Sequence, residues 1–338
     1  MLVVMKRDAT PEQVEHVVNA IRESGLMPHP LPGATRTAIG ITGNTGSVDS
    51  RNFEVLPGVL ECIRVTKAYK LTGREMHPQD TILRVGSTTI GAGTFTIIAG
   101  PCSVENETLT FRMAEMLMQR GIKLMRAGAF KPRTSPYSFQ GLGSKGLEIL
   151  VKAREKTGIG IVTELMDTEH ADEVEAAADM IQIGTRNMQN FSLLRRVSTA
   201  KKAGLLKRGM SGPLQERVVA GEYILAGGNF QVALCERGVR TFADHSRNTL
   251  DLSIVPPVKK HSHLPILVDP SHGTGKAEFV PAMALAGLAA GADGLLVEVH
   301  PEPAKAMSDA AQTIDFATFD KLLSQLKRIA EPLGKTLN

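Results

Sequence analysis

The 338-residue sequence is poor in aromatic and thiol side chains. It has no tryptophan, and aromatic residues make up only 4% of it, which argues against a stacking platform for single-stranded nucleic acid. Three cysteines, Cys62, Cys102 and Cys235, are too few for a disulfide-based scaffold, so we expect a reducing, cytoplasmic setting. No apolar run reaches about 18 residues, and the first residues turn polar after five positions. We therefore expect neither a transmembrane span nor a signal peptide.

The chain also lacks an excess of charge of one sign. Its 39 basic and 35 acidic residues leave a net charge of +4, which is too weak to predict a nucleic-acid partner. A hydrophobic content of 42% is that of a folded globular protein and excludes disorder as the main state. The length suits two domains, or one large α/β barrel with a small companion.

Residues 1–75 have the pattern of a small α+β unit. An apolar run at residues 2–5 predicts a strand, and Thr10-Pro11-Glu12-Gln13 is typical of a helix start with a threonine cap. Further strands around residues 27–31, 38–41 and 59–65, with a helix at 48–56, complete a βαββαβ order, which indicates a ferredoxin-like domain. Such a unit could be a structural or assembly module, or a regulatory module that binds a small effector.

Residues 76–92 are expected to be a connector with a β-hairpin. Apolar or β-branched runs at residues 81–85 and 88–90 flank Gly86-Ser87, which is a hairpin signal.

The remaining residues, 93–338, contain eight short apolar runs separated by amphipathic stretches. Runs without alternation are typical of parallel strands buried on both faces. Eight repeated βα units over about 245 residues predict a (β/α)8 barrel, and the alternative is an open doubly wound sheet. The runs are residues 95–99, 123–126, 159–163, 180–183, 205–207, 232–235, 266–268 and 294–299.

Charged side chains follow these runs and favour the barrel, in which all strand ends converge on one mouth. Six of the residues are cationic, more than one monoanion needs, and they indicate two phosphorylated or carboxylated substrates. They are Arg126, Lys131, Arg133, Arg186, Lys207 and Arg237.

A second group of strand-end residues has the chemistry of a metal site. Cys102, His272, Glu298 and Asp309 offer a thiolate, an imidazole and two carboxylates, which suit one divalent ion such as Mn²⁺, Zn²⁺, Fe²⁺ or Co²⁺. Asp269 and His300 are competing candidates, either as ligands or as partners of the ligands.

Seven strings in the barrel region closely resemble the 3-deoxy-D-arabino-heptulosonate 7-phosphate (DAHP) synthase family, in the branch with an amino-terminal ferredoxin-like domain. These strings are AGPCSVE at 99–105, KPRTSPYSFQG at 131–141, QIGTRN at 182–187, LKRG at 206–209, CERG at 235–238, DPSH at 269–272 and EVHP at 298–301.

The resemblance implies a reaction and a set of roles. Phosphoenolpyruvate would condense with erythrose 4-phosphate and water, in the first step of the shikimate pathway. It implies a metal on Cys102, His272, Glu298 and Asp309. It also implies that Arg186, Lys207 and Arg237 hold the phosphoenolpyruvate phosphate, that Arg126 and Lys131 hold its carboxylate and bridging region, and that Arg133 and Thr134 take the erythrose phosphate. Glu164 would position water, and Lys131 is a candidate proton donor. Together with His272, these two residues make up the expected catalytic set.

The resemblance leaves several alternatives open. The nearest is 3-deoxy-D-manno-octulosonate 8-phosphate synthase, which acts on arabinose 5-phosphate. Others are a Schiff-base aldolase that uses Lys207 and a non-catalytic sensor. We further expect feedback inhibition by Tyr or Phe through residues 1–75, and a homotetramer by analogy with the family.

Overall fold

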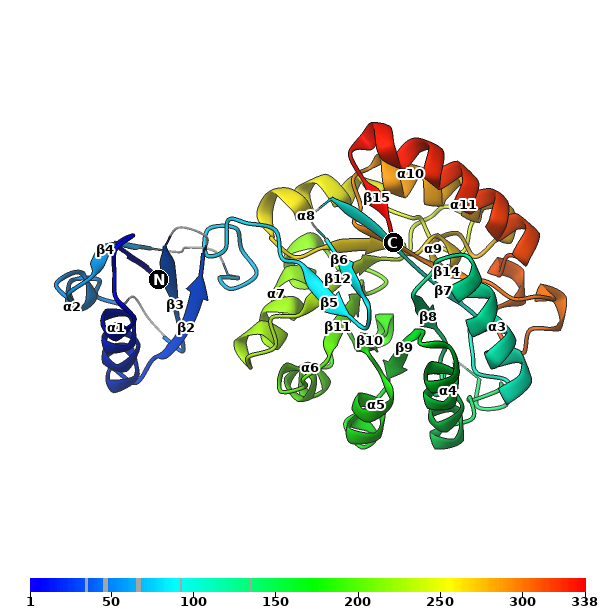
Figure 1. Ribbon diagram of the computed structural model, residues 1–338, viewed down its shortest axis with the longest axis horizontal. Helices are drawn as coiled ribbons and strands as arrows, with labels where there is room; N and C mark the ends of the chain where they lie inside the picture. The colour runs from blue at the N-terminus through cyan, green and yellow to red at the C-terminus, as the bar shows by residue number, and fades with distance from the viewer. Residues whose placement is uncertain (34–35, 45–47, 65–67, 92, 134) are drawn as a thin grey trace. The chain divides into compact units, whose positions relative to one another are not determined.

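Two units, Met1–Gln79 and Asp80–Asn338, make up the chain. They are seen in a computed structural model that describes residues 1–33, 36–44, 48–64, 68–91, 93–133 and 135–338 (Figure 1). Each unit has its own hydrophobic core and is described separately. No helix among these residues is long and apolar enough to cross a membrane.

The first unit is a four-stranded antiparallel sheet with two helices. The strands lie in the order β2-β3-β1-β4, which confirms the predicted ferredoxin-like fold. Its elements are β1 (Leu2–Met5), α1 (Pro11–Glu23), β2 (Met27–Pro32), β3 (Thr37–Thr42), α2 (Arg51–Glu54) and β4 (Val59–Ile63).

Helix α1 forms where its cap and its apolar stripe coincide. Thr10 and Gln13 make a reciprocal capping box, and Val17, Val18 and Ile21 are buried against the sheet. The second helix is shorter than the predicted 48–56. Its start has no side-chain cap and Phe53 is its one buried residue, so little holds a longer helix in place. Residue 65, predicted to end the last strand, lies outside the described residues.

The second unit is a closed barrel of eight parallel strands. Strands β7 to β14 pair in sequence order and β14 pairs back with β7, so the open-sheet alternative is wrong and the (β/α)8 prediction is confirmed. A short ninth strand, β15 (Thr336–Leu337), runs beside β7. The barrel strands are β7 (Thr94–Gly100), β8 (Leu124–Arg126), β9 (Gly160–Leu165), β10 (Met180–Ile183), β11 (Ala203–Lys207), β12 (Val232–Glu236), β13 (Ile266–Val268) and β14 (Gly294–Glu298).

Helices surround the strands on the outside of the barrel (Figure 1). They are α3 (Glu107–Gln119), α4 (Ser144–Thr157), α5 (Ala171–Ala177), α6 (Phe191–Ser198), α7 (Leu214–Ala226), α8 (Val255–His261), α9 (Pro270–Thr274), α10 (Val280–Ala289) and α11 (Phe316–Ala330). Short 3-10 turns occupy residues 185–187, 252–254, 277–279, 303–305, 310–312 and 331–333.

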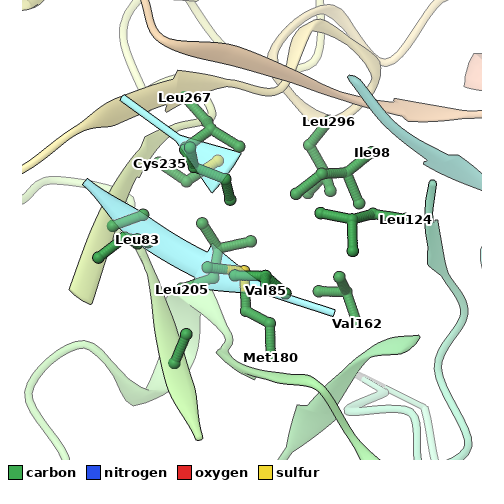
Figure 2. Packing of buried hydrophobic residues seen from close by; sticks show 13 residues of the cluster. Leu83, Val85, Ile98, Leu124, Val162, Met180, Leu205, Cys235, Leu267 and Leu296 are labelled. Atoms are coloured by element: carbon green, nitrogen blue, oxygen red, sulfur yellow. The ribbon is translucent and has the colours of Figure 1, made fainter. Parts of the chain in front are cut away.

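A hairpin closes the amino-terminal end of the barrel. Strands β5 (Leu83–Val85) and β6 (Thr88–Ile90) pair antiparallel. Leu83 and Val85 join one buried cluster with the interior side chains of the barrel strands, such as Leu205 (Figure 2). This apolar plug leaves the opposite, carboxyl-terminal end as the place where strand-end side chains can meet a ligand.

Candidate active site

Charged side chains are buried at the carboxyl ends of the barrel strands. Arg126 ends β8 and Lys207 ends β11, and each is 3% exposed, while Glu298 at the end of β14 is 1% exposed. Burying a charge is costly unless it is paired or meets a ligand. The strand register brings together these ionic groups, which are distant in sequence, so that they can pair with one another or meet a ligand.

These side chains surround a pocket of about 280 Å³. Its walls carry seven cations against two carboxylates, so it suits anionic ligands. Its charged and polar lining comprises Arg126, Lys131, Arg133, Ser135, Ser138, Glu164, Gln182, Thr185, Arg186, Lys207, Arg237, Arg247, His272 and Asp309. Of the other predicted site residues, Cys102 and Glu298 are not part of this lining, and Thr134 lies outside the described residues.

Three of the four predicted metal ligands form one group. The ligand atoms of Cys102, Glu298 and Asp309 all lie within 4.8 Å of one another, and the Cys102 Sγ donates to Asp309 Oδ2 at 3.0 Å. His272 adjoins the group, with Nε2 at 3.5 Å from Glu298 Oε1. Asp309 has a left-handed φ of 52°, a conformation that aspartate tolerates better than most residues.

The carboxylates and the imidazole of this group suit a divalent cation, and the thiol must lose its proton to bind one. Burial raises the pKa of the Cys102 thiol to about 11. Burial opposes ionisation of Asp309, but the Cys102 hydrogen bond and the nearby His272 lower its pKa to about 2. Burial also lowers the pKa of His272, which favours the neutral imidazole that binds metals. Two close carboxylates, a thiol and a neutral imidazole fit one borderline ion.

Asp269 and His300 lie outside this group. Asp269 accepts from Lys207 Nζ at 2.6 Å, and its Oδ2 lies 2.8 Å from Nδ1 of His272. It therefore orients a candidate ligand and a pocket cation at once. His300 Nδ1 accepts from the Glu302 N–H at 3.0 Å, and its Nε2 lies 3.7 Å from Glu105 Oε2.

Several cationic groups of the pocket have hydrogen-bond capacity left over. Among the described residues, Nε and Nη1 of Arg237, Nη2 of Arg133 and Nε of Arg126 are buried with no hydrogen-bond partner. Buried donors are nearly always satisfied in folded proteins, so donors left open at a pocket indicate a missing acceptor. Lys131 is partly engaged, because its Nζ donates to the Cys102 carbonyl at 2.9 Å.

Glu164 is held at the pocket wall by two residues at the carboxyl end of β10, Gln182 and Gly184. Gln182 Nε2 donates to Glu164 Oε2 at 3.1 Å. A Cβ at Gly184 would lie 1.9 Å from Glu164 Oε1, so only glycine allows this position of the carboxylate.

Gln182 and Arg247 are among the polar pocket residues that the sequence did not single out. Gln182 stands at the end of the fourth barrel strand, inside one of the motif strings, and that position was the available signal. Arg247 belongs to a long loop and donates to Gln312 Oε1 at 3.1 Å. No strand end or motif marks it, so only the folded loop shows its place in the pocket lining.

Fold and site together define a barrel enzyme that handles small phosphorylated or carboxylated anions next to a metal group. Family models agree with this class. One described as the DAHP synthetase I family matches residues 73–333, and one described as the DAHP synthase ferredoxin-like domain matches residues 1–67.

Individual relatives point the same way. The chain is 48% identical over 338 residues to "Phospho-2-dehydro-3-deoxyheptonate aldolase" of Thermotoga maritima, with 100% of both chains covered. The crystal structure of the DAHP synthase from that organism superposes with a TM-score of 0.80 at 47% identity and covers 100% of this chain and 99% of the other. A "2-dehydro-3-deoxyphosphooctonate aldolase" of Dichelobacter nodosus is 34% identical over 263 residues, which are 72% of this chain and 92% of that protein.

The chain belongs to the DAHP synthetase I family and has the amino-terminal ferredoxin-like domain. Its enzyme class is 3-deoxy-7-phosphoheptulonate synthase, at the first step of the shikimate pathway.

Proposed function

We propose that the barrel condenses phosphoenolpyruvate with erythrose 4-phosphate and water, and releases 3-deoxy-D-arabino-heptulosonate 7-phosphate and inorganic phosphate. C3 of the enol forms the new bond to the aldehyde carbon. The water oxygen adds at C2, and the bond between C2 and the phosphate ester oxygen then breaks. The observation that carries the proposal is the set of buried, unpaired guanidinium N–H groups of Arg237, Arg133 and Arg126 around the pocket.

Phosphoenolpyruvate is assigned to five cations of the pocket. Arg186, Lys207 and Arg237 would bind its phosphate, and Arg126 and Lys131 would bind its carboxylate and bridging region. Of these five, all but Arg186 are at most 5% exposed, so their attraction for an anion is little screened by water. Fixed cations of this kind neutralise the substrate charge and hold the reacting carbons close together.

Erythrose 4-phosphate is assigned to the outer part of the pocket. Arg133 would bind its phosphate together with Thr134, as the motif predicts. The Arg133 Nε donates to the Phe139 carbonyl at 2.9 Å, which fixes the guanidinium, while its Nη2 lacks a partner among the described residues.

Glu164 and Lys131 are assigned the proton transfers. Glu164, held by Gln182, would orient the water that adds to C2 and accept its proton. Lys131, 5% exposed, would donate a proton to the aldehyde oxygen as that oxygen becomes a hydroxyl.

A divalent ion, Mn²⁺, Zn²⁺, Fe²⁺ or Co²⁺, would be held by Cys102, His272, Glu298 and Asp309. When bound there, it would polarise the aldehyde as a Lewis acid. His272 thus enters the catalytic set as a ligand, and Asp269 orients its ring.

The choice between the heptulosonate and octulosonate reactions can be tested with two sugars. The Thermotoga maritima heptonate enzyme matches both units, and the Dichelobacter nodosus octonate relative covers 72% of the chain. Purified protein is assayed with phosphoenolpyruvate and either erythrose 4-phosphate or arabinose 5-phosphate. We expect turnover with the first sugar. Exclusive use of the five-carbon sugar would establish the octulosonate reaction instead.

We also propose that the ferredoxin-like unit mediates feedback inhibition by Tyr or Phe, and that the enzyme is a homotetramer; both rest on the family resemblance. A truncated chain should begin at Asp80, because Leu83 and Val85 belong to the barrel core. A truncated Thermotoga maritima relative whose solved structure covers 80% of this chain supports the design. Equal responses of the full and truncated chains to Tyr and to Phe would end the regulatory proposal, and light scattering tests the tetramer.

A further inference from the structure

Four charged residues, three of them buried, form an ion cluster next to the pocket, and none of them lines it. We define this ion cluster as Arg208, Arg217, Glu236 and Asp251. Glu236 Oε2 accepts from Arg208 Nη1 at 2.9 Å and lies 3.5 Å from Arg217 Nη1, and the same Arg208 nitrogen donates to Asp251 Oδ2 at 2.8 Å. Both Glu236 and Arg217 are fully buried.

Two of the proposed phosphate-binding cations are sequence neighbours of residues in the cluster. Lys207 and Arg208 are adjacent at the end of β11, and Glu236 and Arg237 are adjacent at the end of β12. Successive side chains of a strand point to opposite sides. Lys207 and Arg237 therefore face the pocket while their neighbours meet each other in the ion cluster.

The bonds of Glu236 and Arg208 also fix the backbone that carries these cations. Glu236 Oε1 accepts from the Gly238 N–H at 2.7 Å and so spans Arg237. Gly238 has a φ of +87°, and a Cβ there would lie 2.8 Å from Asn248 Cβ, so this turn requires glycine. Arg208 donates from Nε to the Gly212 carbonyl at 2.7 Å and from its N–H to the Cys235 carbonyl at 3.0 Å.

Stability alone explains the cluster poorly. Buried ion groups commonly add no net stability over apolar side chains of similar volume. Arg217 illustrates the cost, because its three guanidinium nitrogens have no hydrogen-bond partner among the described residues and burial lowers its pKa to about 10 despite the nearby Glu236. What the cluster does provide is a rigid link between the ends of β11 and β12.

We infer that Glu236 and Arg208 are positioning residues for the phosphate of phosphoenolpyruvate: they hold Lys207 and Arg237 at the spacing that the phosphate requires. The inference rests on the proposed function, which makes those two cations the phosphate site.

The main test is Glu236→Gln, which preserves the shape and the acceptor for Gly238 while it removes the charge that binds Arg208. We expect the KM and the calorimetric Kd for phosphoenolpyruvate to rise about tenfold or more, since small misplacements of binding groups are costly. The KM for erythrose 4-phosphate should stay within about twofold, because Arg133 is not tied to the cluster.

A matched control exists at the other end of the barrel. Asp293 is 1% exposed and accepts from Lys259 and Lys335, so Asp293→Asn also removes a buried, paired carboxylate. We expect it to lower the Tm and leave both KM values unchanged. A Glu236→Gln enzyme with the same pattern as Asp293→Asn would overturn the inference.

Arg208→Lys keeps the test decisive if Glu236→Gln does not fold. It retains the charge and loses the fork that reaches Gly212 and Glu236 together, so phosphoenolpyruvate affinity should again fall selectively. Unchanged affinity in a folded Arg208→Lys enzyme refutes the inference. Failure of the proposed function has a different signature, namely that the unmodified protein neither binds nor turns over phosphoenolpyruvate.

Discussion

Both ends of the barrel hold buried ion pairs, such as Asp293 with Lys259 at one end and Asp269 with Lys207 at the other. They differ in how completely their buried nitrogen atoms are satisfied. At the amino-terminal end, Asp293 accepts from Lys259 Nζ, Lys335 Nζ and the Ile266 N–H at 2.8–3.0 Å, and the hairpin fills the interior with apolar side chains. At the carboxyl-terminal end, buried nitrogens of Arg126, Arg133 and Arg237 have no hydrogen-bond partner among the described residues.

The difference separates charges that complete the fold from charges that await a ligand. An ion pair that saturates its own groups stabilises or orders a structure and offers nothing to a substrate. Unpaired buried donors cost stability, and an incoming anion repays part of that cost on binding.

The largest effect is expected from Cys102→Ala. The change removes the thiol from the group that includes Glu298 and Asp309, so bound divalent metal and turnover should fall below detection while the fold persists. Metal content by mass spectrometry, activity and circular dichroism measure the three quantities. Cys235→Ala is the matched control, because Cys235 is an equally buried cysteine in the barrel core and should keep both metal and activity. Retained metal and activity in Cys102→Ala would contradict the ligand assignment.

A smaller but still large effect is expected from Arg237→Met. Charge-assisted hydrogen bonds contribute about 1.5–3 kcal/mol each, so kcat/KM for phosphoenolpyruvate should drop about 10- to 100-fold or more, at ~1.4 kcal/mol per factor of ten. The corresponding change of a cation to methionine at the amino-terminal end, Lys335→Met, should lower the Tm and leave kcat/KM unchanged. Steady-state kinetics and thermal unfolding of both variants measure the changes in kcat/KM and in Tm. Equal kinetic losses at the two ends would remove the contrast between them.

The residues at the carboxyl-terminal end of the barrel differ in how far sequence alone could place them. Arg126, Lys207 and Glu298 follow apolar runs, and parallel strands bring such positions to one mouth, so their convergence was predictable. The contacts of Arg208 with Glu236 and Asp251 depend on which way each side chain turns at the strand end, and no pattern in the sequence encodes that. Arg247 lies in a loop whose path is set by the fold. The helix expected at residues 48–56 is a single turn because propensity without burial does not hold a longer one.

Metal affinity should depend on pH through Cys102. Burial raises the pKa of its thiol to about 11, so the metal-free protein carries that proton throughout the range from pH 6 to 8. Metal binding to the thiolate must release it, and the affinity for Mn²⁺ should rise about tenfold per pH unit. Calorimetry in buffers of different ionisation enthalpy counts the released proton. A flat profile would mean that the Cys102 thiolate does not bind the ion.

The smallest effect is expected from His170 and Asp167, a pair in the loop after β9. This pair is neither fully buried nor part of the pocket lining. His170 Nδ1 lies 2.9 Å from Asp167 Oδ1, and this hydrogen bond raises the histidine pKa. A raised pKa in the folded state means that the stabilisation is fully present below the unfolded value of about 6.5 and is lost as pH rises through the folded value. Asp167→Asn should therefore lower the Tm by at most about 2 °C at pH 5.5 and by less at pH 8.

The design keeps the His170 ring against Phe130, whose ring centroid is 4.5 Å away, so the substitution changes charge and leaves that contact in place. Parallel unfolding curves at the two pH values, in low and in high salt, measure the difference. A loss of Tm that is the same at both pH values would mean that the pair stabilises the fold without a contribution from the histidine charge. A loss of kcat/KM without any change in Tm would instead place this half-buried pair with the substrate-binding charges of the mouth.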